Sequence, residues 1–265
     1  LFDDEVESKI AGLCDLAPLH NPVNLSGIQK ARELLGDLPH VAIFDTGFHA
    51  TLPNRAKRYA IPPEVAEEYG IRRFGFHGVS HDYVSTLAAD YLASDIRNLR
   101  IITCHLGNGC SVTAVEYGSS TETSMGMTPL EGLVMGTRSG DIDPGAILHL
   151  MRQEGWDVER VDELLNRDSG LEGVSGISND LRDIQKAAAE GDEGARRAIQ
   201  VFSHRVRKYI GGYAATMGGV DAIVFTAGIG ENSALMRHRI GQRLGFLGAR
   251  LEEDKNRQVE LTDEK

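Results

Sequence analysis

A glycine-rich segment, His105-Leu106-Gly107-Asn108-Gly109, carries residue types that suit a phosphate-binding turn. Glycines permit positive φ and have no side chain, so their backbone N–H groups can approach an anion closely. The flanking stretches are rich in β-forming residues, and Asn-Gly is typical of the turn of a hairpin. An ordinary hairpin needs the same residues for its geometry alone. The segment therefore predicts a hairpin, and phosphate binding is one of two interpretations.

A second glycine-rich segment, Gly228-Ile229-Gly230-Glu231-Asn232, follows the apolar stretch 220–225. At the start of a helix, such a backbone lets a nucleotide base or sugar lie flat against it. The alternative is a plain turn between a strand and a helix. The dinucleotide fingerprint G-x-G-x-x-G is excluded, because its third glycine is absent.

Arg138 lies in a loop bounded by Gly136 and Gly140. Its planar guanidinium matches phosphoryl oxygens, and an arginine used in this way contributes about 10³ to 10⁵ to the rate of phosphoryl transfer. A surface ion pair is the alternative. Asp141 and Asp143 offer carboxylates for Mg²⁺, although an aspartate before a proline is more typical of a helix N-cap.

Two histidines, His77 and His81, are four residues apart. On a helix they would share one face, which suits zinc. Gly75 and Gly78 indicate instead that His77 lies on a turn. We therefore expect His77 to hydrogen-bond a phosphoryl oxygen rather than to hold a metal.

The segment Ser178-Asn179-Asp180-Leu181-Arg182 is typical of a helix start, with Ser178 or Asn179 as the N-cap. Capping alone explains these residue types. The second interpretation is that Asp180 and Arg182 face a ribose or a phosphate.

A further polar segment, Asp45-Thr46-Gly47-Phe48-His49, follows the short apolar run Val41-Ala42-Ile43-Phe44. Such a run predicts a strand that is buried on both faces. Because α/β proteins bind ligands at the carboxyl ends of their strands, the polar segment is a candidate part of a site.

Hydrophobic periodicity predicts the elements that must hold these segments. We expect helices over residues 1–13, 24–35, 143–151 and 195 to about 218, and strands over residues 41–44, 100–104, 111–115 and 220–225. The chain contains neither an internal repeat nor a Pro/Ser-rich linker. We therefore place any domain boundary at a hinge around residues 45–55.

Composition excludes several classes of protein. Of the 265 residues, 41% are hydrophobic and 25% are charged, which is ordinary for a soluble globular protein. The net charge of −11, without a basic cluster, excludes nucleic acid as a partner. Three cysteines without a CxxC pair indicate a reducing compartment. No apolar run reaches the ~18 residues of a membrane span, so we expect a cytoplasmic protein.

Together these segments resemble the acetate kinase (acetokinase) family, which includes acetate and propionate kinases. The order and spacing match over nearly the whole chain, in the segments 45–49, 76–81, 105–109, 136–144 and 228–232. The resemblance implies the α/β fold of actin, Hsp70 and sugar kinases (ribonuclease H-like), with two domains that close over a nucleotide. Residues 1–46 would be a remnant of the N-terminal acceptor-side domain, and residues 47–265 would form the nucleotide-binding domain.

The resemblance also implies roles for individual residues. Asp45, His77 and Arg138 would be catalytic, the last two as stabilisers of the transition state. Leu19, Phe76 and Pro129 would line a small apolar pocket for the alkyl group of the acceptor. Contacts to ATP would come from His105, Leu106, Gly107, Asn108, Gly109, Asp180, Leu181, Arg182, Gly228, Ile229, Gly230, Glu231 and Asn232.

Several family features have no counterpart in this sequence. They are the first strand with its glycine/serine turn, an acceptor-binding arginine, and a glutamate linked to Mg²⁺ in the C-terminal segment. We therefore assign no Mg²⁺ ligand, expect the chain to be a truncated piece of a longer protein, and expect it to be poorly active on its own. Gly47, where the family often has alanine, is a harmless departure.

The resemblance implies the reversible phosphorylation of acetate by ATP with Mg²⁺, which gives acetyl phosphate and ADP, and it also implies a homodimer. A carboxylate with a pKa of ~4 to 5 is already ionised, so its attack needs no base. Propionate and butyrate stay open as acceptors, since one methylene is worth only ~1 to 3 kcal/mol. Two other classes stay open: a nucleotide-binding ATPase of the same superfamily, and a metal-dependent hydrolase that uses His77, His81 and Asp45.

Overall fold

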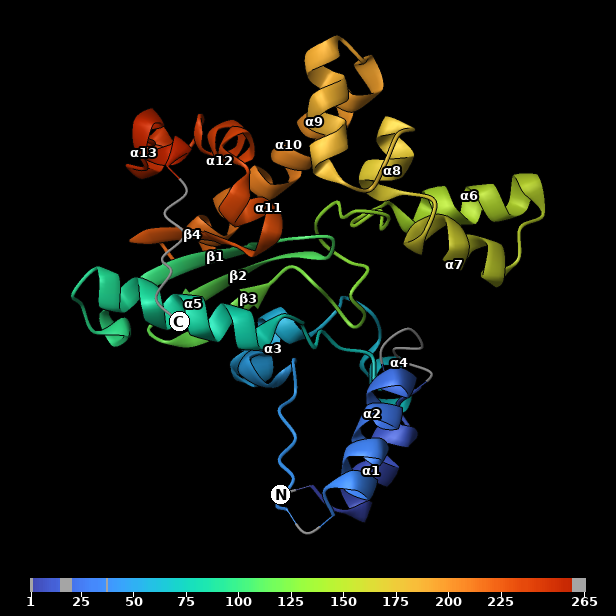
Figure 1. Ribbon diagram of the computed structural model, residues 1–265. Coiled ribbons are helices and arrows are strands. Elements are labelled where there is room, and N and C mark those ends of the chain that lie inside the picture. The colour runs from blue at the N-terminus through green and yellow to red at the C-terminus, as the bar shows by residue number, and fades with distance from the viewer. Residues whose placement is uncertain (1, 15–20, 37, 259–265) are drawn as a thin grey trace.

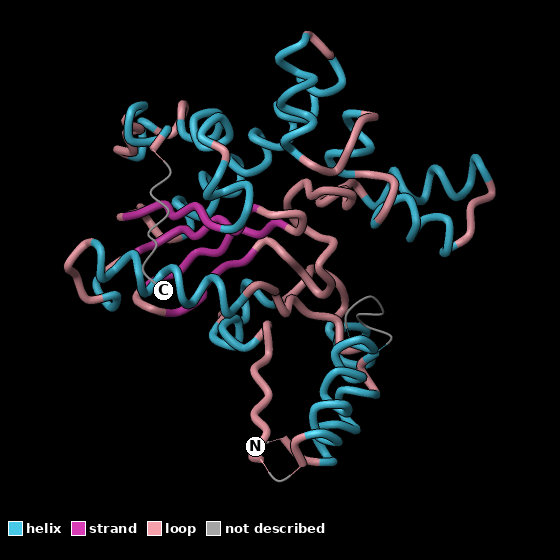
Figure 2. Tube along the Cα trace, viewed as in Figure 1, coloured by secondary structure: helices cyan, strands magenta, loops and turns pink. Residues whose placement is uncertain are grey.

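The computed structural model describes residues 2–14, 21–36 and 38–258, and its centre is a four-stranded mixed sheet (Figure 1). The strands are β1 (Arg100–Leu106), β2 (Cys110–Glu116), β3 (Ser119–Thr123) and β4 (Ala222–Thr226), in the order β3-β2-β1-β4. Helices cover both faces of the sheet (Figure 2). The predicted α/β class is confirmed.

The predicted hairpin is β1 and β2, which pair antiparallel from Arg100↔Glu116 to Leu106↔Cys110 and leave residues 107–109 as the turn. Each strand extends beyond its predicted range. The predicted strand at 220–225 is β4, which pairs parallel to β1 from Ile101↔Ala222 onward. β3, which sequence reasoning did not predict, pairs antiparallel to β2.

Two hydrophobic clusters lie on opposite faces of the sheet, because successive side chains of a strand point in opposite directions. Ile102 and Cys104 of β1 belong to the larger cluster, which includes Phe202 of α10 (Glu193–Thr216). Ile101 belongs to the smaller cluster with Ala89 of α5 (Gly78–Tyr91). In Figure 1, α5 and α10 accordingly lie on opposite sides of the sheet.

The predicted helices are present with adjusted ends: α1 (Asp4–Ala11), α2 (Asn21–Leu34), α6 (Pro144–Glu154) and α10. The other helices are α3 (Asn54–Lys57), α4 (Pro63–Glu68), α7 (Val158–Asn166), α8 (Gly170–Ser175), α9 (Leu181–Glu190), α11 (Ala227–Asn232), α12 (Ala234–Gly241) and α13 (Glu253–Arg257), with short 3₁₀ turns η2 (Gly47–Thr51), η3 (Ile96–Asn98) and η4 (Gly245–Leu247). Within the described ranges, no helix is both long and apolar enough to cross a membrane.

The predicted strand at residues 41–44 is wrong. These residues have no regular secondary structure, and the side chains of Val41 and Ile43 are 71% and 79% exposed. A strand needs a neighbour to receive its backbone hydrogen bonds, and no other described segment pairs with this one. The adjacent helices α1 and α2 contact each other, have no buried residue, and lie apart from the sheet (Figure 1).

Candidate functional site

Polar side chains gather at the turn end of the hairpin, on the face that α5 covers. Thr103 and His105 follow Ile101 on this face of β1, and Ser111 lies opposite His105 in the register of β2. His81 of α5 contacts Thr103 and Ser111, with ring-nitrogen-to-oxygen distances of 2.7 Å to each. The alternation of the two strands thus places hydroxyl and imidazole groups together beside the turn.

His77 lies on a turn, as its neighbouring glycines predicted, and immediately precedes α5. Its φ of 59° is in the left-handed region, which is uncommon for a residue with a side chain. Asp45 holds this conformation, since its Oδ2 accepts a hydrogen bond from the His77 amide at 2.6 Å and its carbonyl accepts one from Gly78 at 2.8 Å. The His77 ring stacks on the ring of His105, with centroids 4.0 Å apart.

Arg138 approaches the same place from its loop. Its Nη1 donates to the carbonyl of Pro129 at 2.6 Å. A Cβ placed on Gly109 would lie 3.2 Å from Arg138 Nη2 and 3.5 Å from His77 Nε2. The two predicted stabilisers of a transition state therefore meet over the glycine turn. Burial lowers the pKa of Arg138, and an arginine side chain keeps its positive charge at neutral pH.

The hairpin turn at residues 107–109 and the loop that carries Arg138 pack directly against each other. Gly136 donates its N–H to the carbonyl of Asn108 at 2.9 Å. A Cβ on Gly136 would lie only 1.9 Å from Asn108 Oδ1, so a larger residue here would displace the Asn108 side chain. Within the turn, the Gly107 N–H donates to the carbonyl of Gly109 at 3.1 Å.

The two aspartates of the arginine loop support structure. Asp143 is the N-cap of α6, as its position before a proline predicted, and accepts from the N–H of Gly145 at 2.8 Å. Asp141 accepts from Tyr209 Oη and from the Gly132 N–H, both at 2.8 Å. Among the described residues, no group of three or more histidine, cysteine or acidic side chains could hold a metal ion.

Two of the three segments predicted to contact the nucleotide lie at the starts of helices, and the third is the hairpin turn at residues 107–109 with the end of β1. The N-cap of α9 is Asp180, which accepts from the N–H of Arg182 at 2.9 Å, so the prediction of Ser178 or Asn179 as the cap is wrong. Leu181 is buried beneath this helix start.

The second motif, residues 228–232, forms α11 directly after β4. Glu231 accepts from the Thr226 hydroxyl at 2.8 Å and from the Ala227 N–H at 3.0 Å, which fixes Ala227 at a φ of 63°. A Cβ on Gly230 would lie 3.2 Å from the backbone of Phe225, so this helix packs closely on the end of the strand.

Two of the three predicted pocket residues lie beside the catalytic candidates. Phe76 directly precedes His77, with its carbonyl 3.0 Å from His49 Nε2, and the carbonyl of Pro129 receives the bond from Arg138. Leu19 lies outside the described residues.

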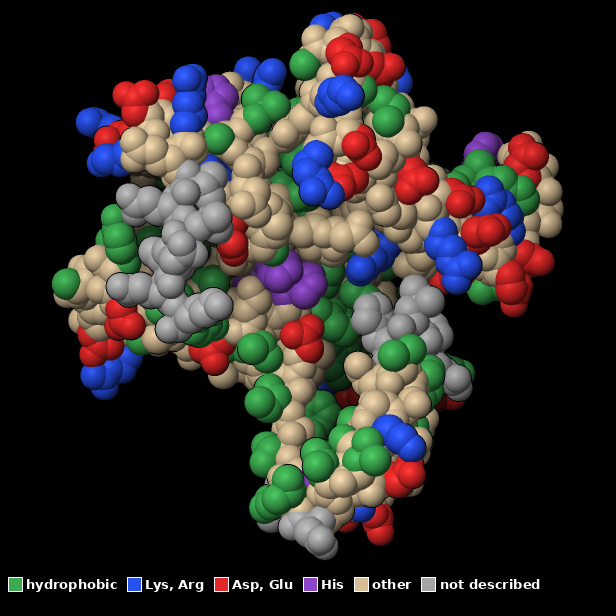
Figure 3. Space-filling model, in the orientation of Figure 1, with side chains coloured by type: hydrophobic (Ala, Val, Ile, Leu, Met, Phe, Trp, Pro, Cys, Tyr) green, Lys and Arg blue, Asp and Glu red, His purple; other side chains and the backbone are tan. Residues whose placement is uncertain are grey.

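Four histidines share this part of the molecule, and burial lowers the pKa of His49, His81 and His105. His81 is fully buried, and its pKa lies well below its ordinary value, because burial and the neighbouring histidines disfavour a positive charge. Figure 3 shows histidine side chains exposed at the centre of this face of the molecule. Sequence reasoning missed Thr103 and Ser80. The Ser80 hydroxyl oxygen lies 2.9 Å from His105 Nδ1. For Thr103, the alternation of polar residues along β1 was the available signal.

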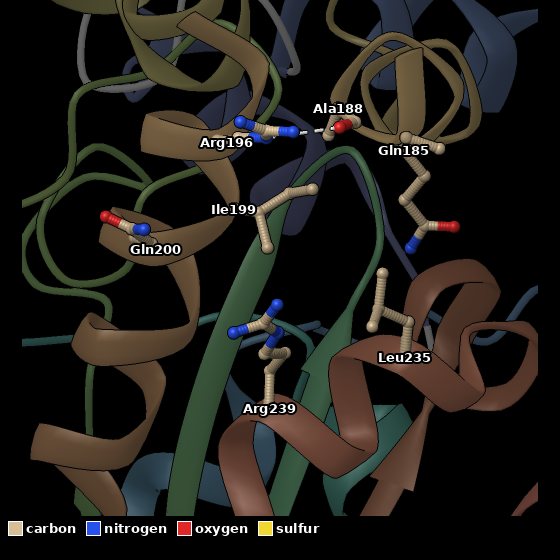
Figure 4. A pocket seen from close by; sticks show the side chains of 8 residues that line it. Gln185, Ala188, Arg196, Ile199, Gln200, Leu235 and Arg239 are labelled. Carbon is tan, nitrogen blue, oxygen red and sulfur yellow. Dashed lines mark hydrogen bonds between the residues drawn. The ribbon is translucent and has the colours of Figure 1, made fainter. Parts of the chain in front are cut away.

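A separate cavity of about 260 Å³ lies among α9, α10 and α12, and none of the predicted site residues lines it. In Figure 4, Ile199 and Leu235 point into this space, and Arg239 approaches it from α12. Gln185 Nε2 donates to the hydroxyl of Ser233 at 2.6 Å and so ties α9 to the start of α12. The wall of this cavity therefore includes α9, which begins at the predicted nucleotide contacts 180–182, and α12, which follows the motif at residues 228–232.

Comparison with known proteins gives one consistent result. The sequence profile of the acetokinase family matches residues 1–264. The chain is 56% identical to the acetate kinase of Halothermothrix orenii over 97% of its own length, and 53% identical to that of Thermotoga maritima over 98%. It covers 64% of each of these relatives, so it spans slightly less than two thirds of their length.

Solved structures agree with the sequence relatives. The fold matches the acetate kinase of Porphyromonas gingivalis with a TM-score of 0.93 at 45% identity, over 97% of this chain and 65% of that one. It matches a propionate kinase from Francisella tularensis with a TM-score of 0.92 at 46% identity, over 97% of this chain and 66% of that one.

Proposed function

The chain belongs to the acetokinase family, and from that premise we propose that it is the nucleotide-binding part of an acetate kinase. The reaction is the reversible transfer of a phosphoryl group from ATP to acetate, which gives acetyl phosphate and ADP. The relatives that are 52–56% identical to this chain are acetate kinases. The partners are therefore ATP or ADP and a short-chain carboxylate, and the family also favours a homodimer in the cytoplasm.

The finer fold assignment is to the actin, Hsp70 and sugar-kinase superfamily. It is supported by the sheet, in which three successive antiparallel strands are followed by a parallel one that arrives after a long helical stretch. We assign residues 47–265 to the nucleotide-binding domain and residues 1–46 to the acceptor side. The separation of α1 and α2 from the sheet supports this division.

One observation carries the proposed function: Arg138 and His77 converge over Gly109 at the turn of the hairpin. Phosphoryl transfer places negative charge on the equatorial oxygens of the moving group, and a guanidinium and an imidazole are suited to bind them. The acceptor carboxylate is already ionised, so a base has nothing to remove. Asp45 acts here by fixing the turn that carries His77.

We assign the remaining contacts by position. Residues 105–109 and 228–232 would receive the phosphates and the nucleoside, together with Asp180, Leu181 and Arg182 at the start of α9. Phe76 directly precedes His77 in the sequence, and Pro129 accepts a hydrogen bond from Arg138. Their positions support a place for the small alkyl group of the acceptor beside His77 and Arg138. Leu19 stays a prediction.

Mg²⁺ would enter with the nucleotide and neutralise charge on its phosphates. Mg²⁺ typically keeps several waters and takes ligands from substrate phosphates. Among the described residues, no cluster of three or more histidine, cysteine or acidic side chains could hold the ion by itself, and Asp45, Asp141 and Glu231 each accept hydrogen bonds from the protein. We therefore assign no side chain as a ligand of the ion.

Calorimetric titration with MgADP, alone and then with aluminium fluoride and acetate, tests the function without requiring turnover. Aluminium fluoride mimics the phosphoryl group in flight, and acetate is its acceptor, so together they should tighten the binding of MgADP. Arg138→Ala should reduce this tightening by about 10³-fold, because an arginine at such a site contributes 10³ or more to transfer. The variant should still bind MgADP.

Arg152→Ala is a matched control, since Arg152 is an exposed arginine of α6 whose side chain makes no hydrogen bond or ion pair with other described residues. It should behave as the parent. Absence of MgADP binding would refute the proposal. Binding without any effect of acetate would favour an ATPase of the same superfamily, and stronger tightening by propionate would favour a propionate kinase, as in the Francisella tularensis relative.

A further inference from the structure

Ser111 lies between the two histidines of the His77–His81 pair. Its hydroxyl oxygen is 2.8 Å from His77 Nδ1 and 2.7 Å from His81 Nε2. The other ring nitrogen of His81, Nδ1, is 2.7 Å from Thr103 Oγ1. Ser111, His81 and Thr103 are all fully buried. These four side chains therefore form a continuous hydrogen-bonded row that runs from the interior of the sheet to the candidate site.

The direction of this row follows from the number of protons available. The Thr103 hydroxyl donates to the carbonyl of Thr113 at 3.4 Å, so its oxygen is left to accept from His81 Nδ1–H. His81 is neutral, because burial holds its pKa well below the ordinary value, and a neutral imidazole has one N–H. Its Nε2 must therefore accept the single proton of the Ser111 hydroxyl. The Ser111 oxygen can then only accept from His77.

We propose that Ser111 is a positioning residue, which accepts a hydrogen bond from His77 Nδ1–H and thereby selects the tautomer that directs the Nε2 lone pair of His77 toward Gly109 and Arg138. The role rests on the proposed function, because it concerns the same site. A proton that binds at Nε2 leaves the Nδ1–H···Oγ bond unchanged. The row thus holds the ring in one orientation whether His77 is neutral or cationic, and the cation can donate to a phosphoryl oxygen.

Nitrogen-15 NMR of the ring nitrogens tests the tautomer directly and needs no nucleotide. In the unaltered protein at pH 8, His77 should carry its proton on Nδ1, and its signals can be assigned by their loss in His77→Gln. In Ser111→Ala the preference for Nδ1–H should disappear. A proton on Nε2 in the unaltered protein would overturn the proposal, whether or not the chain proves to be a kinase.

The effect of Ser111 on ligand binding is tested by the MgADP titration with aluminium fluoride and acetate. Ser111→Ala should lose about tenfold of the tightening, equivalent to one hydrogen bond, while the affinity for MgADP alone stays the same. Ser111→Thr retains the hydroxyl and should restore most of the tightening. Equal losses in the alanine and threonine variants would overturn the role of the hydroxyl.

Ser120→Ala is the matched control. Ser120 is also a fully buried strand serine whose hydroxyl contacts a histidine, His49 Nδ1, at 2.9 Å. It should lower the urea midpoint of unfolding about as much as Ser111→Ala, yet leave the His77 tautomer and the tightening unchanged. If Ser120→Ala reduced the tightening as much as Ser111→Ala, general loss of packing would explain both, and the positioning role would be refuted.

Discussion

Replacement of Gly78 by alanine should loosen the turn that presents His77. A Cβ at this position would lie 2.3 Å from the carbonyl oxygen of Asp45 and 3.1 Å from Phe48 Cβ. The first contact is with backbone, so Asp45 must move away. That movement breaks the bond from the Gly78 N–H to the Asp45 carbonyl and strains the bond from the His77 amide to the Asp45 carboxylate.

The magnitude follows from these two bonds. A neutral backbone hydrogen bond contributes about 1 kcal/mol, and one to a charged group about 1.5 to 3 kcal/mol. Alanine at the start of α5 recovers up to about 1 kcal/mol through helix propensity. We therefore expect Gly78→Ala to lower the free energy of unfolding by about 1.5 to 4 kcal/mol, which urea denaturation at pH 8 can measure.

Gly212→Ala gives the matched comparison. Gly212 lies inside α10, and a Cβ there would meet no atom within 4 Å. Because alanine is the better helix former, the substitution should raise stability by about 0.5 to 1 kcal/mol. The reasoning would be refuted if Gly78→Ala proved as stable as the parent while Gly212→Ala showed its expected gain.

Two further effects on stability follow from burial. Stability should fall as the pH drops below about 6.5, because burial lowers the pKa values of His49 and His81, which stay neutral in the folded state while the unfolded chain takes up protons. Each histidine contributes a slope of up to about 1.4 kcal/mol per pH unit between pH 6.5 and its lowered pKa, and urea midpoints that do not change between pH 7 and 5 would contradict this. Phe202→Ala should lower the free energy of unfolding by about 3 to 5 kcal/mol, since the Phe202 side chain is fully buried. Val201→Ala, on the exposed side of α10, should lower it by less than about 1 kcal/mol, and urea unfolding of both variants measures the difference.

Local signals in the sequence predicted part of this fold correctly. The Asn108-Gly109 turn between apolar flanks and the apolar face of α10 specify their elements through residues close in sequence, so both were found. The run Val41–Phe44 has the composition of a strand but no partner among the described segments, and pairing cannot be read from composition. The strand Ser119–Thr123 was missed for the opposite reason, since its polar residues form a strand only because β2 lies beside it.

The candidate site shows the same limit. The residue types of His77 and Arg138 led to the prediction that they bind phosphoryl oxygens, which stays a prediction, whereas their convergence over Gly109 is a property of the fold. Three consecutive residues, Ser178 to Asp180, are all good N-caps, and only the backbone geometry selects the last of them. The contact between Asp45 and the His77 amide spans 32 positions, so no sequence pattern could reveal it.

The arrangement of β1 between β2 and β4 also has a consequence during synthesis. β2 follows β1 after a short turn, so the hairpin can close as soon as both strands have left the ribosome. β4 is made only after α6 to α10, and until then one edge of β1 has no partner. An apolar strand with an open edge can pair with the wrong chain. We therefore expect the nascent protein to be prone to aggregation until residues 222–226 join the sheet.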